Sequence, residues 1–315
     1  MGVFLCLQNE SWGLLPADWE AVGKTMRSMF KSTQWRQHIA LDVGTATTRI
    51  ATGQSSMAER PSLIGCKRAL RDGVVVDGDA VSYILEPFFT QARRFGIFKP
   101  CVLACAPSNA RHEERQILSD SIMKAGAFSV SIIPEPLAAA IGSGLDVSSP
   151  YARMVIDIGE GVTDCAVIRS SKILVTSVIR VGCERMRQAI VNEGPRYGCS
   201  YIDDTYAEML MHRCGLMRSA EHTGSVFVAT ALQPVFKQII DTIDSFLQDL
   251  PDEVGCEVID SGITLTGGGA LIPGVKEYLE RRTGITTTVV SNPRAAVVEG
   301  ARAIVPVVLF LNQWK

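Results

Sequence analysis

Two short segments of this chain share one pattern about 115 residues apart, and this duplication constrains the fold more than any other feature of the sequence. They read HIALDVGTATTRIATG, from His38 to Gly53, and MVIDIGEGVTDCAVI, from Met154 to Ile168. In each, an apolar strand leads into Asp-x-Gly and small or hydroxyl residues, and a second strand follows. The pattern predicts two similar strand-turn-strand units in two related halves of the molecule.

A turn of this kind is suited to holding phosphate. Glycine allows positive φ and close approach to a ligand, exposed N–H groups point at phosphate oxygens, and an Asp at the strand end can hold the hydration shell of Mg²⁺. One such turn is weak evidence, because most Asp-x-Gly sequences form ordinary tight turns. Two copies that face each other would grip one polyphosphate between two domains.

A third glycine segment, GITLTGGGALIPGVKEYL, runs from Gly262 to Leu279. It predicts a strand that leads into three glycines and then a helix that begins near Pro273. A glycine turn at a helix start suits the ribose, base or phosphate of a nucleotide. The same pattern is also compatible with an ordinary strand-to-helix connection of an α/β domain.

Composition is consistent with two folded α/β domains. The chain has 315 residues, 47% of them hydrophobic, and no apolar run reaches the ~18 residues that span a bilayer. A net charge of −2 and a pI near 6.1 provide no basic surface for DNA or RNA, so we expect no nucleic-acid partner. Nine cysteines without a C-x-x-C pair favour reduced thiols in the cytosol.

The order and spacing of the three glycine segments resemble the actin-like ATPase superfamily and, within it, the MreB family of bacterial cell-shape proteins. Four further segments resemble MreB sequences in the same order. They read RDGVVVDGDAVSYIL (residues 71–85), KPCVLACAPSNARHEERQIL (99–118), AGAFSVSIIPEPLAAAIGSGLDV (125–147) and SNPRAAVVEGARAI (291–304). The resemblance covers about residues 36–304 and is weakest over 194–224.

The resemblance implies an α/β, actin-like fold. Two related domains, each with a mixed, mostly parallel sheet flanked by helices, would enclose a nucleotide cleft. The expected divisions are an N-terminal extension (1–35), domain I (36–150, completed by 293–315) and domain II (151–292). Only about ten residues, Leu216 to Ser225, stand where the family has a small outer subdomain, so we expect that part to be reduced.

The resemblance also implies roles in the cleft. Asp42 and Asp157 match the acids that face Mg²⁺ through water, and Glu135 matches the carboxylate that polarises the attacking water. From its position alone, Glu135 also fits a helix-start acid. The residues that match the nucleotide-binding turns are Gly44, Thr45 and Ala46, then Gly159, Glu160, Gly161 and Val162, then Gly267, Gly268 and Gly269. The implied cofactors are ATP and Mg²⁺, with Asp42, Glu135 and Asp157 as catalytic residues.

The second turn departs from the family pattern Asp-x-Gly-Gly-Gly-Thr. Glu160 adds a carboxylate beside a polyanion, which at ~4 Å and an effective dielectric near 20 costs about 4 kcal/mol unless the side chain turns to solvent or binds Mg²⁺. Val162 lacks the hydroxyl that would help to hold water, and Thr163 is expected on the opposite face. Met211 and Arg213 stand where the family has Lys and Glu near the ribose and base. These changes predict impaired hydrolysis.

Two segments are candidates for membrane contact. Residues 19–30 place Trp19, Met26 and Phe30 on one face of a predicted amphipathic helix, which either packs on its own domain or lies on the membrane, as in many MreB-type proteins. Ile97–Phe98 match an exposed apolar loop of the family, although such residues are as often packed inward. The run from Val305 to Trp314 is too short to span a bilayer and is expected to finish the sheet or form a terminal helix.

Three functions remain open from the sequence. The preferred one is an MreB-like, membrane-associated cytoskeletal filament for cell shape: a homopolymer in the cytoplasm on the inner membrane face, with membrane-bound morphogenesis proteins as partners and slow ATP hydrolysis. The alternative is a non-hydrolysing actin-like scaffold that binds nucleotide weakly or not at all. A sugar kinase or chaperone of the superfamily is disfavoured, because the segments between the glycine turns resemble MreB.

Overall fold

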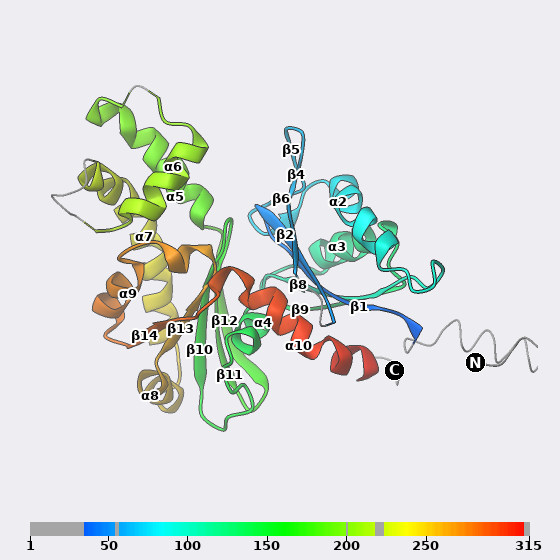
Figure 1. The fold of residues 1–315 in the computed structure, drawn as a ribbon. Coiled ribbons are helices and arrows are strands. Elements are labelled where there is room, and N and C mark those ends of the chain that lie inside the picture. Colours follow the sequence, from blue (N-terminus) through cyan, green and yellow to red (C-terminus); the bar gives the residue numbers. More distant parts are fainter. Residues whose placement is uncertain (1–34, 54–56, 200, 218–223, 312–315) are drawn as a thin grey trace, which may run out of the picture.

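The computed structural model describes residues 35–53, 57–199, 201–217 and 224–311. These residues form two five-stranded sheets that lie on either side of two central helices (Figure 1). The predicted amphipathic helix over residues 19–30 lies outside the described residues.

The two sheets share one plan. The first has the strand order β3-β2-β1-β8-β9, with β1 (His38–Val43), β2 (Thr47–Thr52), β3 (Ala58–Pro61), β8 (Cys101–Ala106) and β9 (Ser129–Pro134). The second has the order β12-β11-β10-β13-β14, with β10 (Arg153–Ile158), β11 (Thr163–Arg169), β12 (Lys172–Ile179), β13 (Ile263–Thr266) and β14 (Thr287–Val289). In both, the central strand continues into an antiparallel partner on one side and has a parallel partner on the other.

The mixed sheets expected from the sequence are confirmed, but they are not mostly parallel. Each sheet has two antiparallel and two parallel pairings. The reason is local: three consecutive strands at the start of each half form an antiparallel meander, and only the strands that follow helices return in parallel.

Alternate residues of the central strands face different cores. In β1, Ile39 and Leu41 pack against α2 (Gly78–Gln91) and α3 (His112–Lys124), whereas Ala40 faces the centre of the molecule. In β10, Ile156 faces the outer helices and Val155 the centre. The outer helices of the second half are α5 (Cys183–Glu193), α6 (Asp204–Cys214), α7 (Ser225–Gln248), α8 (Asp252–Ser261) and α9 (Val275–Thr283).

The central layer consists of α4 (Glu135–Gly142) and α10 (Ala296–Leu311). Their small residues, Ala138 and Ala301 among them, share one buried cluster with residues of both sheets. The C-terminal segment that was expected to complete domain I begins with a 3₁₀ turn, Pro293–Ala295, and continues as α10 to Leu311. Of the two forms expected for the apolar run after Val305, the helix is the one found. The segment packs most extensively against α4 and, of the two sheets, mainly against β1 and β8 of the first.

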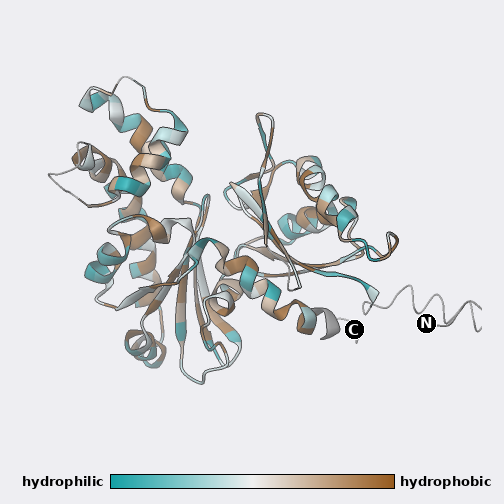
Figure 2. Ribbon diagram, viewed as in Figure 1, coloured by the Kyte–Doolittle hydropathy of each residue, from teal (hydrophilic) through white to brown (hydrophobic). Residues whose placement is uncertain are grey.

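In Figure 2 the strands are largely brown or white, and the hydrophilic residues lie mainly on peripheral helices and loops. Among the described residues, only α7 is long and apolar enough, by length and composition, to cross a membrane. Half of its most apolar stretch is buried inside the protein, where Phe236 and Ile239 join the core of the second half. This burial is the behaviour of a core helix.

Candidate functional site

A cavity of about 440 Å³ lies between the two sheets, a volume within the usual range of small-molecule sites. Its lining includes twelve of the residues predicted from the sequence: Asp42, Gly44, Thr45, Ala46, Glu135, Asp157, Gly159, Glu160, Gly161, Val162, Gly267 and Gly268. Gly269 does not line it. This glycine lies beneath the turn against Ile158, whose Cγ2 would be 2.2 Å from a Cβ at position 269.

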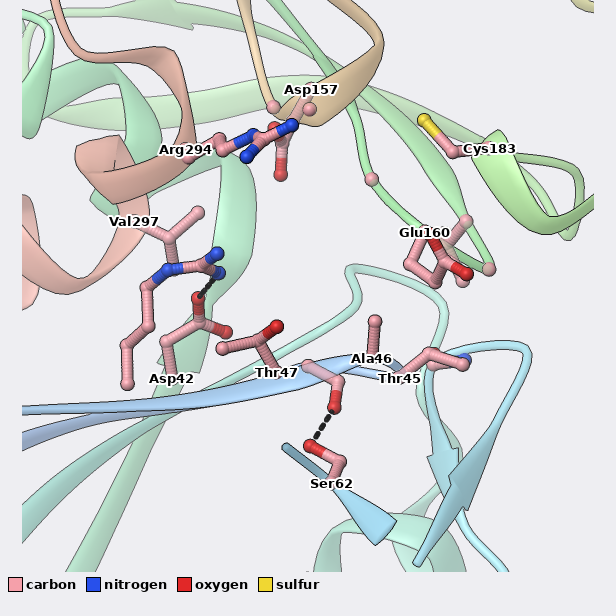
Figure 3. A pocket seen from close by; sticks show the side chains of 18 of the residues that line it. Asp42, Thr45, Ala46, Thr47, Ser62, Asp157, Glu160, Cys183, Arg294 and Val297 are labelled. Carbon is pink, nitrogen blue, oxygen red and sulfur yellow. Dashed lines mark hydrogen bonds and ion pairs between the residues drawn. The ribbon is translucent and has the colours of Figure 1, made fainter. Parts of the chain in front are cut away.

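The duplicated hairpins bring the two predicted acids to equivalent positions. Asp42 is near the end of central strand β1 and Asp157 near the end of central strand β10. Both are almost fully buried, and Figure 3 shows them pointing toward each other from opposite walls of the cavity. Asp157 accepts a hydrogen bond from Thr266 Oγ1 (3.0 Å), which ties it to the strand before the third glycine turn.

The first and second glycine turns touch directly. The Thr45 hydroxyl accepts a hydrogen bond from the Gly73 N–H (3.0 Å) and lies beside Gly161. A Cβ at position 161 would be 2.8 Å from Thr45 Oγ1 and 2.9 Å from the Asp72 Cα. Gly161 is therefore required by close approach of the two loops, because a larger residue would separate the two walls of the cavity.

The base of the cavity has a surplus of carboxylates, which burial makes hard to ionise. Burial raises the pKa of Asp157 to about 6 and that of Asp164 to about 7. The pKa of Glu135 is raised well above its ordinary value by burial and by the neighbouring aspartates. Among the described residues, eight acidic and four arginine side chains line the cavity, so a polyanion there needs a cation beside it, either an arginine side chain or a divalent metal ion. This surplus fits a hydrated divalent cation between Asp42 and Asp157.

Glu160 does not face the cavity as a free charge. Both its carboxylate oxygens bind Arg187, with Arg187 Nη1 3.1 Å from Oε2. Arg187 also contacts Asp204 (2.9 Å) and Glu208 (3.3 Å). Burial disfavours the charged guanidinium, but the hydrogen bonds to Glu160 and Asp204 outweigh it and raise the pKa of Arg187 above its ordinary value. The sequence interpretation anticipated solvent or Mg²⁺ as the partner of Glu160; the partner is an arginine of α5.

Val162 and Thr163 lie as the sequence predicts. The Thr163 side chain is completely buried and donates a hydrogen bond to the Val181 carbonyl (2.8 Å), so its hydroxyl points away from the cavity. Val162 packs at Gly73, where an added Cβ would be 2.5 Å from Val162 Cγ2. At position 162 the second turn therefore presents the methyl groups of a valine to the cavity instead of a threonine hydroxyl.

The wall formed by α6 and the segment before α10 differs from the expectation. Met211 lines the cavity, but Arg213 does not. Glu208, His212 and Arg294 line it instead, with Arg294 Nη2 3.1 Å from His212 Nε2. Burial and the nearby Arg294 lower the pKa of His212, which favours a neutral ring that can accept this hydrogen bond.

Sequence reasoning also missed Arg49 of β2. It lies directly opposite Asp42 in the hairpin, with its Nη1 3.6 Å from Asp42 Oδ2. The sequence contained the information needed to find it, because a hairpin that turns at Gly44 to Ala46 brings positions 42 and 49 face to face. Arg187 gave no such signal, since it is 27 residues from Glu160 along the chain and meets it only through helix packing.

Known proteins of similar sequence and structure were found by three comparisons. The family model described as MreB/Mbl protein matches residues 54–218 and 210–309. The cell shape-determining protein MreB of Escherichia coli (strain K12) is 30% identical over 88% of this chain and 94% of its own length. The structure of MreB 5 of Spiroplasma citri bound to AMPPNP is 25% identical, with a TM-score of 0.81, over 88% of this chain and 98% of that chain. The MamK double helical filament is 16% identical, with a TM-score of 0.75, over 86% and 99%.

Proposed function

The chain belongs to the MreB/Mbl family of actin-like proteins, and from this premise we propose that it binds ATP with Mg²⁺ between its two sheets and assembles with itself into cytoskeletal filaments. The observation that carries the proposal is the cavity walled by all three glycine turns, with Asp42 and Asp157 facing each other across its base. The similar MreB 5 was solved with AMPPNP, and the more distant MamK as a double helical filament, which supports both parts.

Mg²⁺, when bound, would neutralise phosphate charge at this base. The chain's own contribution is to place Asp42 and Asp157 where they can hold the waters of a hydrated ion, and to offer the backbone N–H groups of the glycine turns to phosphate oxygens. Glu135 begins α4 and lines the cavity, and its proposed role is to orient water and to take its proton. We infer slow hydrolysis, because the second turn provides Val162 in place of a hydroxyl.

A non-hydrolysing scaffold is the second candidate, and the orientation of Thr163 favours it. With the only nearby threonine hydroxyl of this turn bonded to the Val181 carbonyl, the attacking water loses a partner on that side. Nucleotide would then hold the two halves together without turnover.

The inner face of the cell membrane is the proposed location of the filaments. The loop that follows α2 exposes Phe95 (72%) and Ile97 (63%), while Phe98 is half-buried under its edge-on contact with Phe95. Arg94, which flanks them, is exposed. Two apolar side chains beside basic residues suit insertion at a lipid headgroup boundary. Membrane-bound morphogenesis proteins are the proposed partners at this surface.

A titration of the full chain with ATP and Mg²⁺, following binding heat and phosphate release together, tests the proposal. We expect binding, with phosphate release much slower than binding, and we expect Asp157→Asn to weaken the Mg²⁺-dependent part of binding. Binding without release would favour the scaffold. An absence of binding heat at millimolar ATP would contradict the nucleotide site as such.

A further inference from the structure

The duplicated hairpins differ at one position of the cavity base. In each, the residue seven positions after the aspartate is its direct cross-strand partner: Arg49 opposite Asp42, and Asp164 opposite Asp157. Directly opposed residues lie on the same face of a sheet, so both partners project toward the cavity, and both line it. One half of the molecule thus places a cation where the other half places a carboxylate.

Arg49 contacts two acids, one by a good hydrogen bond and one at longer distance. Its Nε donates to Glu59 Oε1 at 3.0 Å, whereas its Nη1 is 3.6 Å from Asp42 Oδ2, beyond the usual range of a hydrogen bond. The dashed line at Asp42 in Figure 3 marks this ion pair. The charge of Arg49 opposes the rise in pKa that burial causes at Asp42 and also at Asp157. The guanidinium therefore acts on both walls of the base.

The other arginines that line the cavity in the described part of the chain are engaged elsewhere. Arg187 is surrounded by three acids, Arg68 pairs with Glu184 at 2.5 Å, and Arg294 contacts His212. Arg49 is the cation at the acidic base, and its weakest contact, the one to Asp42, is the one that a more highly charged acceptor would replace.

We propose that Arg49 is a phosphate ligand and supplies part of the positive charge that a divalent cation otherwise provides, so that this chain binds nucleoside triphosphate without Mg²⁺. A guanidinium fork matches two phosphate oxygens, and such charge-assisted bonds are shorter and stronger than the present 3.6 Å contact. When the phosphate replaces Asp42 as its partner, that carboxylate becomes available to a hydrated ion. The inference rests on the proposed nucleotide site and refines it.

The test is calorimetric titration of the full chain with ATP, inorganic tripolyphosphate and adenosine, each in excess Mg²⁺ and in EDTA. For the native chain we expect ATP and tripolyphosphate to bind in EDTA within about tenfold of their affinity in Mg²⁺, a difference of about 1.4 kcal/mol. Arg49→Gln is expected to lose at least about tenfold for both phosphates in EDTA and to leave adenosine unchanged. Arg49→Lys, which keeps the charge without the fork, should recover part of the loss.

Arg60→Gln is the matched control, because Arg60 lies on the neighbouring strand β3 outside the cavity, 5.6 Å from the Phe88 ring centroid. Glu59→Gln should have the opposite effect to Arg49→Gln. It removes the carboxylate that accepts the 3.0 Å hydrogen bond from Arg49 and competes with phosphate for this guanidinium, so it should tighten phosphate binding in EDTA. Thermal unfolding checks that each variant folds. If Arg49→Gln does not fold, the test relies on the other two variants: phosphate affinity in EDTA should fall in Arg49→Lys and rise in Glu59→Gln.

The outcomes separate two failures. If the native chain does not bind ATP even with Mg²⁺, the proposed nucleotide function is wrong and the inference falls with it. If the native chain binds ATP with Mg²⁺ but loses all binding in EDTA, or if Arg49→Gln and Arg49→Lys both bind as the native chain does, the nucleotide site stands and the role of Arg49 is wrong.

Discussion

At the scale of single residues, Glu160 shows how a neighbour changes the meaning of a substitution. Taken alone, a carboxylate in a phosphate-binding turn repels the ligand. In the structure Glu160 is one of three acids that contact Arg187. The arginine balances the charge of Glu160, but the cluster of three acids and one arginine keeps a net negative charge. The repulsion that the sequence predicts is reduced, and it now depends on Arg187.

Arg187→Gln should therefore weaken ATP binding more than any change at Glu160. Removing one partner of a buried ion pair leaves the other uncompensated, and we expect a loss of at least about tenfold in affinity, or about 1.4 kcal/mol. Glu160→Gly should tighten binding, and the double variant should lie close to the native chain. Calorimetry on the four proteins of this cycle measures the coupling. Additive effects of the two changes would contradict the coupling.

The buried aspartates predict how stability changes with pH. Folded pKa values of about 6 for Asp157 and about 7 for Asp164 lie above the ordinary value of 3.8. The folded state therefore binds more protons than the unfolded state between about pH 4 and pH 7, and the free energy of unfolding falls as pH rises through that window, by about 1.4 kcal/mol for each pKa unit at most.

Thermal unfolding of the native chain and of Asp164→Asn from pH 5 to pH 8 checks this expectation. The native melting temperature should fall more steeply with pH than that of Asp164→Asn, because the variant lacks one titrating carboxylate. Mg²⁺ with ATP, which favours the ionised carboxylates, should restore stability at the upper end. Parallel curves for the two proteins would exclude Asp164 as a contributor.

At the scale of elements, the contact between α4 and α10 determines how closely the two halves approach each other. A Cβ at Gly142 would be 1.9 Å from the Ala296 carbonyl oxygen, and a Cβ at Gly300 would be 1.8 Å from the Ala138 carbonyl oxygen. The two helices therefore touch backbone to backbone, which only glycine permits at these crossing points.

Gly300→Ala should destabilise the protein by about 2 kcal/mol or more, because a methyl group must push one helix away from the other. Gly255→Ala is the control: this glycine also lies in a helix, α8, but an added Cβ would meet nothing within 4 Å. There the change should stabilise by about 0.5–1 kcal/mol through helix propensity. Urea unfolding measures both, and equal effects of the two changes would refute the close contact.

At the scale of the whole molecule, the apolar loop after α2 projects at the end of the first half where β1 begins (Figure 1). The guanidinium of Arg36, just before β1, donates to the Lys99 carbonyl (2.9 Å), which fixes the base of this loop. The start of the described chain and the loop therefore lie close together. A membrane-binding face is expected at this end.

Replacing Phe95 and Ile97 by Ser should at least halve co-sedimentation of the full chain with anionic liposomes, because it removes the exposed apolar side chains that would insert. Ile259→Ser is the matched control, since Ile259 is exposed to a similar extent (59%) but lies on α8 in the other half. Equal losses in the two proteins would indicate general surface stickiness, and unchanged binding of the loop variant would rule the loop out.

The sequence predicted those parts of the site that are formed locally. Each glycine turn is formed by a few consecutive residues, so Asp42, Asp157 and the turns were identified from the chain alone. Glu160 and Arg187 meet through packing of α5 on the second turn, a contact that no short segment encodes. The sequence left the form of the run after Val305 open between strand and helix for another reason: an apolar run containing Pro306 has no clear helical or strand period.

The chain crosses between its halves twice, once after α4 and once before α10, and these crossings lie beside each other at a contact that glycines keep tight. The two halves are therefore joined at one hinge, the contact between α4 and α10. A rotation there would change the separation of Arg68 of the first half and Glu184 of the second, an ion pair that joins the halves beside the cavity. Formation and loss of this ion pair would therefore report the nucleotide state of the cleft.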